Sequence, residues 1–106
     1  MTQTILLSFL VGVLAANATP HFVKGITKEP FPTLFGTSPL VNLVAGWAMY
    51  VMATTLVITA QLGSHPIPAL AAGAAGVLAM GVFHARGGAF VLGRRPARAA
   101  SGSLSE

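Results

Sequence analysis

The chain has 106 residues, of which 54% are hydrophobic and only 8% are charged. A soluble domain usually carries about 25% charged residues, so this composition excludes a water-soluble domain and predicts an integral membrane protein. The net charge of +4 comes without any nucleic-acid-binding motif, and its expected partners are anionic lipid headgroups. The absence of cysteine excludes disulfides, thiolate catalysis and cysteine-based metal or iron–sulfur sites.

Three apolar stretches predict transmembrane helices at about residues 4–18, 40–62 and 66–84. A spanning helix needs about 20 residues, which the second and third stretches supply and the first barely reaches. Three segments cannot close a barrel, so the predicted fold class is all-α, an integral membrane bundle of three helices. We expect residues 1–93 to form this single domain and residues 94–106 to be a disordered, basic and serine-rich cytoplasmic tail.

Prolines and glycines predict where these helices begin and end. Pro20 disfavours helical geometry at the residue before it, so we expect the first helix to end there. Ser38 can cap the second helix while Pro39 occupies its first turn. Pro66 can begin the third helix after a tight turn, and residues 86–88 are expected to follow its end.

Residues 16–18, Ala-Asn-Ala, also resemble a signal-peptidase site after an apolar segment. However, the first four residues, Met-Thr-Gln-Thr, contain no lysine or arginine, and a signal peptide normally begins with positive charge. Cleavage would also place every basic residue outside the cell, against the usual bias. We therefore favour a retained first span.

The distribution of basic residues predicts the orientation in the membrane. With three spans, the Pro- and Phe-rich interfacial loop over residues 17–39 and the C-terminal tail lie on the same side. Cytoplasmic segments carry an excess of lysine and arginine, so this side is predicted to be cytoplasmic and the N-terminus outside. The predicted topology and lipid anchors are Lys24, Lys28, Arg86, Arg94, Arg95 and Arg98.

The same loop carries the pattern N-x-x-P-H-F-x-x-G, then F-P-T-x-F-G, then S-P-x-x-N. The pattern is formed by Asn17, Pro20, His21, Phe22, Gly25, Phe31, Pro32, Thr33, Phe35, Gly36, Ser38, Pro39 and Asn42, followed by Gly46 and Trp47. Over about residues 17–47 the chain resembles small bacterial integral membrane proteins that have no assigned activity. The resemblance implies a bacterial inner-membrane protein and brings no cofactor or catalytic residue with it.

Two histidines are the candidate cofactor ligands. In the predicted topology, His21 and His84 lie near the cytoplasmic ends of their helices and could face each other, as a pair that holds haem iron or contributes to a zinc site. Asn17 precedes His21 by four residues and would share its helix face. Zinc needs further ligands that the sequence does not offer, so we expect two separate interfacial histidines, with no cofactor and no metal.

Small residues recur four apart along the third predicted span, an arrangement that allows helix backbones to approach closely. The predicted helix-packing residues are Ala69, Ala72, Gly73, Gly76 and Ala79. Ala75 also precedes Ala79 by four residues. These residues could pack within the monomer, against a second copy or against a membrane-protein partner.

No nucleophile–base pair, phosphate-binding loop or metal cluster is readable, so we expect no enzyme and no catalytic residue. The sequence favours a small accessory or interaction subunit of a larger membrane assembly, or a homo-oligomer, with the third helix and the loop as contacts. One alternative is a holin-like or channel-like pore, for which Thr54, Thr55, Thr59 and Gln61 supply a faint polar stripe. Another is a haem- or metal-carrying electron-transfer subunit that uses the two histidines.

Overall fold

The computed structural model describes residues 1–92 and contains three long helices and no strand in that range. The helices are α1 (Thr2–Ile26), α2 (Pro39–Thr59) and α3 (Pro66–Ala85), and a short 3₁₀ turn, η1 (Leu62–Ser64), joins α2 to α3. Each of the three long helices is long and apolar enough to cross a membrane. The predicted all-α fold with three transmembrane helices is confirmed.

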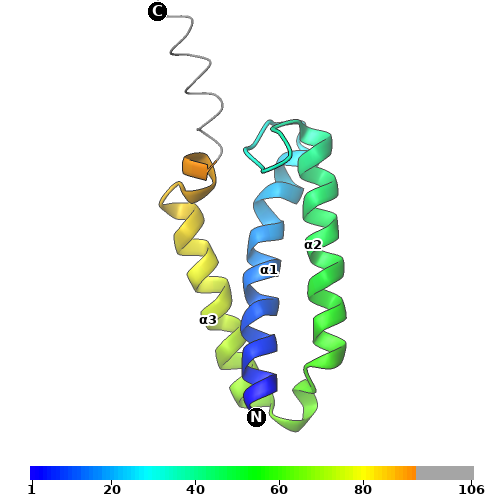
Figure 1. Cartoon of the computed structure of the whole chain (residues 1–106), viewed down its shortest axis with the longest axis vertical. Coiled ribbons are helices and arrows are strands. Elements are labelled where there is room, and N and C mark those ends of the chain that lie inside the picture. Colours follow the sequence, from blue (N-terminus) through cyan, green and yellow to red (C-terminus); the bar gives the residue numbers. More distant parts are fainter. Residues whose placement is uncertain (93–106) are drawn as a thin grey trace, which may run out of the picture.

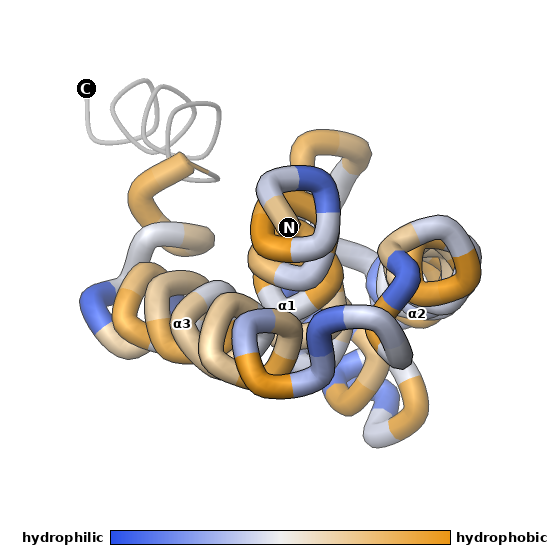
Figure 2. Tube along the Cα trace, turned by 90° about the horizontal axis from the view of Figure 1, so that it is seen from below, coloured by the Kyte–Doolittle hydropathy of each residue, from blue (hydrophilic) through white to orange (hydrophobic). Residues whose placement is uncertain are grey.

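The helices form an open layer with α1 in the middle. α1 packs against α2 on one side and α3 on the other, whereas α2 and α3 have almost no contact with each other (Figure 1). Seen along the helices, apolar residues run along the outside of all three (Figure 2). Large side chains such as Leu6, Ile58 and Leu78 are more than 60% exposed. An apolar exterior of this kind is stable only in lipid or against another protein.

The predicted starts of the second and third helices are confirmed. Ser38 is the N-cap of α2, and its hydroxyl accepts a hydrogen bond from the Val41 amide at 3.1 Å. Pro39 and Pro66 occupy the first turns of α2 and α3. α3 ends at Ala85, one residue before the 86–88 segment, in which Gly87 adopts a positive φ of 76°. Residues 88–92 return to helical geometry.

The prediction that Pro20 ends the first helix was wrong. α1 continues through Pro20 to Ile26 and is 25 residues long. Pro20 removes a single backbone donor, and a neighbouring helix can compensate for such a defect in a membrane. Here the residues after Pro20 are held against α2, because a Cβ on Gly25 would lie 2.6 Å from Leu43 Cα. The first span is therefore longer than the sequence predicted, and it exceeds the length of about 20 residues that a spanning helix needs.

The connection between α1 and α2 is consequently shorter than the sequence predicted and covers residues 27–38. It folds back onto the helices. Phe31 is buried with 7% exposure, whereas Phe35 on the same loop is 83% exposed. Phe22, which was also expected in the interfacial loop, lies in α1 and packs against Tyr50 with ring centres 5.7 Å apart.

Candidate functional site

Four polar side chains from three helices meet at one end of the molecule, beneath the 27–38 loop. Asn17 and His21 come from α1, Asn42 from the first turn of α2, and His84 from the last turn of α3. Asn42 is fully buried and His21 is 7% exposed. Buried polar groups are costly in an apolar environment unless they are hydrogen-bonded, so this cluster is held by a specific network.

Asn42 connects the loop to α1. Its amide Nδ2 donates to the carbonyl oxygens of Phe31 at 2.8 Å and Ser38 at 3.0 Å. Its Oδ1 lies 2.7 Å from His21 Nδ1. One side chain thus fixes both the path of the loop and the orientation of the His21 ring.

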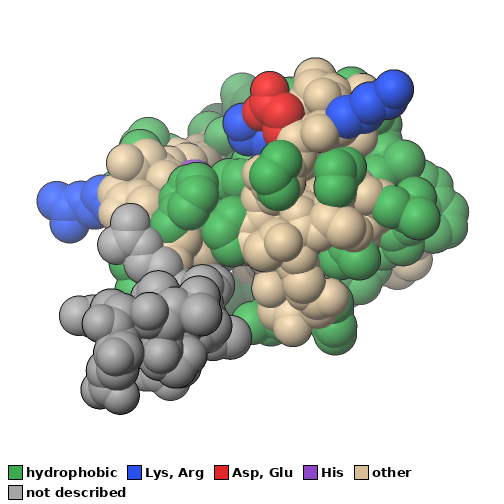
Figure 3. Space-filling view, turned by 90° about the horizontal axis from the view of Figure 1, so that it is seen from above, with side chains coloured by type: hydrophobic (Ala, Val, Ile, Leu, Met, Phe, Trp, Pro, Cys, Tyr) green, Lys and Arg blue, Asp and Glu red, His purple; other side chains and the backbone are tan. Residues whose placement is uncertain are grey.

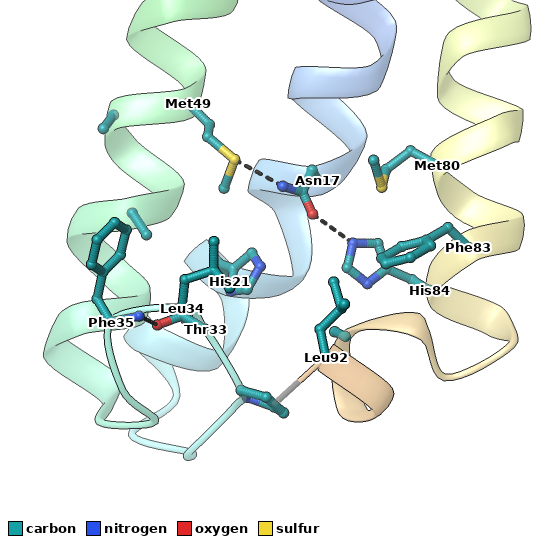
Figure 4. A pocket seen from close by; sticks show the side chains of 14 residues that line it. Asn17, His21, Thr33, Leu34, Phe35, Met49, Met80, Phe83, His84 and Leu92 are labelled. Atoms are coloured by element: carbon teal, nitrogen blue, oxygen red, sulfur yellow. Dashed lines mark hydrogen bonds between the residues drawn. The ribbon is translucent and has the colours of Figure 1, made fainter. Parts of the chain in front are cut away.

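Asn17 plays the corresponding part for His84. Figure 4 shows its side chain between Met49 of α2 and His84 of α3. Asn17 Nδ2 donates to Met49 Sδ at 3.1 Å, and Asn17 Oδ1 lies 2.7 Å from His84 Nε2. The central helix therefore holds the two outer helices together through one amide group.

The two histidine rings are neighbours, with centres 6.2 Å apart and planes at 77°. Phe31 lies edge-on to His21 at 5.1 Å and also approaches His84 at 6.3 Å, and Phe83 approaches His84 at 5.3 Å. The expectation of two separate interfacial histidines does not hold geometrically. The continuation of α1 beyond Pro20 brings His21 under the loop and next to α3.

A cavity of about 480 Å³ adjoins the cluster, between α2 and α3 and over α1. Its wall includes Asn17, His21 and His84, together with the thioethers of Met49 and Met80. The 32–35 part of the loop and two residues of the 88–92 segment complete it. The cavity is thus mostly apolar, with imidazole and thioether groups as its distinctive chemistry.

Four of the five predicted helix-packing residues of α3 are buried or half-buried, and the fifth is exposed. Gly76 and Ala69 are buried against α1, and a Cβ on Gly76 would lie 2.2 Å from the Phe9 carbonyl oxygen. Ala72 and Gly73 are half-buried, and a Cβ on Gly12 of α1 would lie 2.1 Å from the Gly73 carbonyl oxygen. Ala79, by contrast, is exposed.

Three of the predicted anchors, Lys24, Lys28 and Arg86, lie at the end of the molecule that carries the 27–38 loop. Figure 3 looks onto this end and shows its basic and acidic side chains. Lys24 forms an ion pair with Glu29 at the surface. Arg94, Arg95 and Arg98, and the predicted tail, lie outside the described residues.

The three threonines of the polar stripe weighed for a pore donate hydrogen bonds within their own helix. The hydroxyls of Thr54, Thr55 and Thr59 donate to the carbonyl oxygens of Tyr50, Val51 and Leu56, at 2.9, 2.9 and 3.0 Å. Gln61, the fourth member, lies beyond the end of α2 in left-handed geometry. The three hydroxyl donors of the stripe are therefore used within α2, and their exposed oxygens can still accept hydrogen bonds.

The three apolar helices place the chain in the class of multi-pass membrane proteins. No protein-family model, no curated protein and no solved structure matches it. Among the described residues, no group of three or more His, Cys, Asp or Glu side chains gathers as a metal site. Any function must therefore be argued from the cluster and the helix faces themselves.

Sequence reasoning did not assign a role to Asn42, Met49 or Phe31 in this site. The four-residue spacing of Asn17 and His21 did indicate a shared helix face, and the helix does continue through both. A buried asparagine near a helix start, following a capping serine, is the signal that could have linked Asn42 to the loop.

Proposed function

We propose that the protein is a non-enzymatic interaction subunit of the bacterial inner membrane that acts by packing against another transmembrane helix. The observation that supports this proposal most directly concerns α3. Its glycine face is used inside the monomer against α1, yet Ala71, Ala75 and Ala79, four residues apart, remain exposed on the helix. Rows of small residues permit close contact between helices in lipid, where bulky side chains offer no such advantage.

The arrangement of the helices supports this proposal. α2 and α3 each have one helical neighbour, so most of their surface faces outward. The proposed orientation places the loop end, with Lys24, Lys28 and Arg86, in the cytoplasm against anionic headgroups. A pore is less favoured, because the threonines of α2 bond their own helix.

Site-directed photo-crosslinking in native membranes tests the packing role. The chain contains no cysteine, so Ala75→Cys provides a single attachment point for a photoreactive maleimide on α3. We expect a discrete adduct, either with a second copy, at twice the monomer mass, or with one larger membrane protein identified by mass spectrometry.

The matched control is Ile58→Cys, at an apolar position on α2 that is 78% exposed. It should give only lipid adducts and unmodified monomer. Monomer alone from the Ala75 position, or identical adducts from both positions, would contradict the proposed contact.

A further inference from the structure

The hydrogen bonds of the cluster determine which nitrogen of His21 carries its proton. Asn42 Nδ2 is bonded to carbonyl oxygens, which only accept, so it is the NH₂ group and Oδ1 is an acceptor. His21 Nδ1, 2.7 Å from that oxygen, is therefore the N–H donor. In a neutral imidazole the other nitrogen, Nε2, then holds a lone pair and can only accept a hydrogen bond.

His21 Nε2 is an acceptor that a molecule in the cavity can reach. Within residues 1–92 it has no hydrogen-bond partner, yet it is not among the fully buried unpaired side-chain atoms of that range, which are Ser8 Oγ and His84 Nδ1. The His21 side chain is one of those that line the cavity of about 480 Å³ (Figure 4). In so apolar a space only the occupant or a trapped water can supply the missing donor.

The cavity wall carries no formally charged side chain. Among the described residues that line it, there is no lysine, arginine, aspartate or glutamate. Burying a charge without a partner costs far more free energy than burying a hydroxyl that is hydrogen-bonded, so the cavity favours a neutral ligand over a phospholipid phosphate. For the same reason it favours the neutral form of His21, because an imidazolium would have no acidic partner in the wall.

Aromatic rings and thioethers form much of the wall. Phe35 and Phe83 contribute rings, and Met49 and Met80 contribute sulfur atoms, which make favourable contacts with aromatic groups. A cavity of about 150 Å³ accepts benzene, so about 480 Å³ has room for a substituted ring and the start of an apolar tail. We propose that this cavity binds a neutral, membrane-soluble phenol of the hydroquinone class, whose hydroxyl donates to His21 Nε2.

A ligand of this kind can enter the cavity from the bilayer. The cavity lies between α2 and α3, which have almost no contact with each other, so no helix packing closes it on that side. His21 lies near the loop, whereas Met49 and Met80 lie farther along the helices (Figure 4). The polar and apolar parts of the wall are thus ordered as a phenol with an apolar tail requires.

NMR titration of protein with isotope-labelled histidines, in detergent, tests the site with two matched ligands. 4-Propylphenol carries the hydroxyl donor, whereas 4-propylanisole has the same ring and tail with a methyl ether in its place. We expect the phenol to shift the signal of the unprotonated His21 nitrogen and to bind at least about 10-fold more tightly, because the ether leaves Nε2 unpaired. The signals of His65, at the opposite end of the molecule, should not shift.

The reduced and oxidised forms of one ligand provide a second comparison. Trimethylhydroquinone can donate a hydrogen bond to His21 Nε2, whereas trimethylbenzoquinone presents carbonyl oxygens, which only accept. Under anaerobic conditions the hydroquinone should therefore bind more tightly than the quinone. Preference for the quinone would contradict the assignment of Nε2 as the acceptor.

Ala48→Phe tests the location of the ligand without changing the hydrogen-bonded cluster. Ala48 lines the cavity and is half-buried, so a larger side chain there should fill the space and abolish binding of the phenol. Val51→Phe is the matched control, because Val51 lies on the same helix, is 45% exposed and does not line the cavity. The comparison of the two ligands in the wild type remains decisive if the Ala48 variant does not fold.

No binding of the phenol by folded wild-type protein, or equal affinity for the phenol and its ether, would overturn the proposal. Displacement of the phenol by an anionic phospholipid would overturn the choice of a neutral ligand. The site goes beyond the proposed contact of α3 and can fail separately from it, because Ala71, Ala75 and Ala79 do not line the cavity.

Discussion

At the scale of single residues, the structure depends most on two asparagines. Asn42 and Asn17 each use both ends of their amide group, so each joins two separate parts of the chain. Within lipid a lost hydrogen bond is not replaced by water, which makes these amides more specific than their modest average strength indicates. His21 and His84 are oriented by them and by Phe31 and Phe83.

Replacing Asn42 with alanine is expected to destabilise the protein and release the loop. The substitution removes the bonds to Phe31, Ser38 and His21 and leaves buried groups without partners, at a cost of about 1–3 kcal/mol. Thermal unfolding followed by circular dichroism should show a lower midpoint, and protease should cut the 27–38 loop faster.

Thr55→Ala is the matched control, because the Thr55 hydroxyl bonds only to the Val51 carbonyl of its own helix. It should unfold like the wild type. Equal unfolding midpoints for the Asn42 variant and the wild type would show that the loop is held in another way.

At the scale of the helices, glycine sets how closely α1 meets each neighbour. Gly12 and Gly76 allow backbone contact between α1 and α3, and Gly25 and Gly46 do the same between α1 and α2. A Cβ on Gly46 would lie 2.6 Å from the Phe22 amide nitrogen. The regular spacing of small residues predicted close packing on the α3 side. On the α2 side the two glycines are 21 residues apart and show no regular spacing, so no pattern predicted that contact.

Gly76→Val is therefore expected to separate α1 from α3 and lower the stability. The new side chain would meet the Phe9 carbonyl, part of the backbone, which cannot move aside cheaply. Overpacking of this kind costs about 1–3 kcal/mol. Denaturation in a mixed detergent, followed by tryptophan fluorescence and circular dichroism, measures the loss.

Gly81→Val provides the control on the same helix, since a Cβ at Gly81 has nothing within 4 Å. Both variants carry the same change in helix propensity, so the difference between them isolates the contact. Similar losses at the two positions would mean that the Gly76 contact contributes nothing to stability.

At the scale of the whole molecule, charge and connectivity predict the orientation. α1 lies between the outer helices, so its removal as a signal peptide would leave α2 and α3 with almost no contact. The loop end carries Lys24, Lys28 and Arg86, while the opposite end carries the N-terminus and η1. The excess of basic residues on cytoplasmic segments predicts that the loop end faces the cytoplasm.

Single cysteines can report this orientation, because the native chain has none. Ser64→Cys should react with a membrane-impermeant maleimide added to intact cells. Lys28→Cys should react only after the cells are permeabilised. Labelling of the Lys28 position from outside, with protection of the Ser64 position, would reverse the proposed topology.

Local signals in the sequence determined which solvent the protein needs, how many spans it has and where two of them begin. Hydropathy over about 20 residues, the Ser38–Pro39 cap and Pro66 act on their own segments, so no tertiary information was required. The local signal of Pro20 gave a wrong end for the first helix. Packing of α1 against α2 offsets the cost of the backbone N–H that proline lacks.

Only the tertiary structure decided that α1 is central and that Asn17, His21, Asn42 and His84 form one cluster. These residues come from three helices, and their meeting depends on how each helix is rotated and how closely it approaches the next. Glycine contacts distributed along α1 set both quantities at once. Such contacts join residues far apart in the chain, and no spacing within one segment records them.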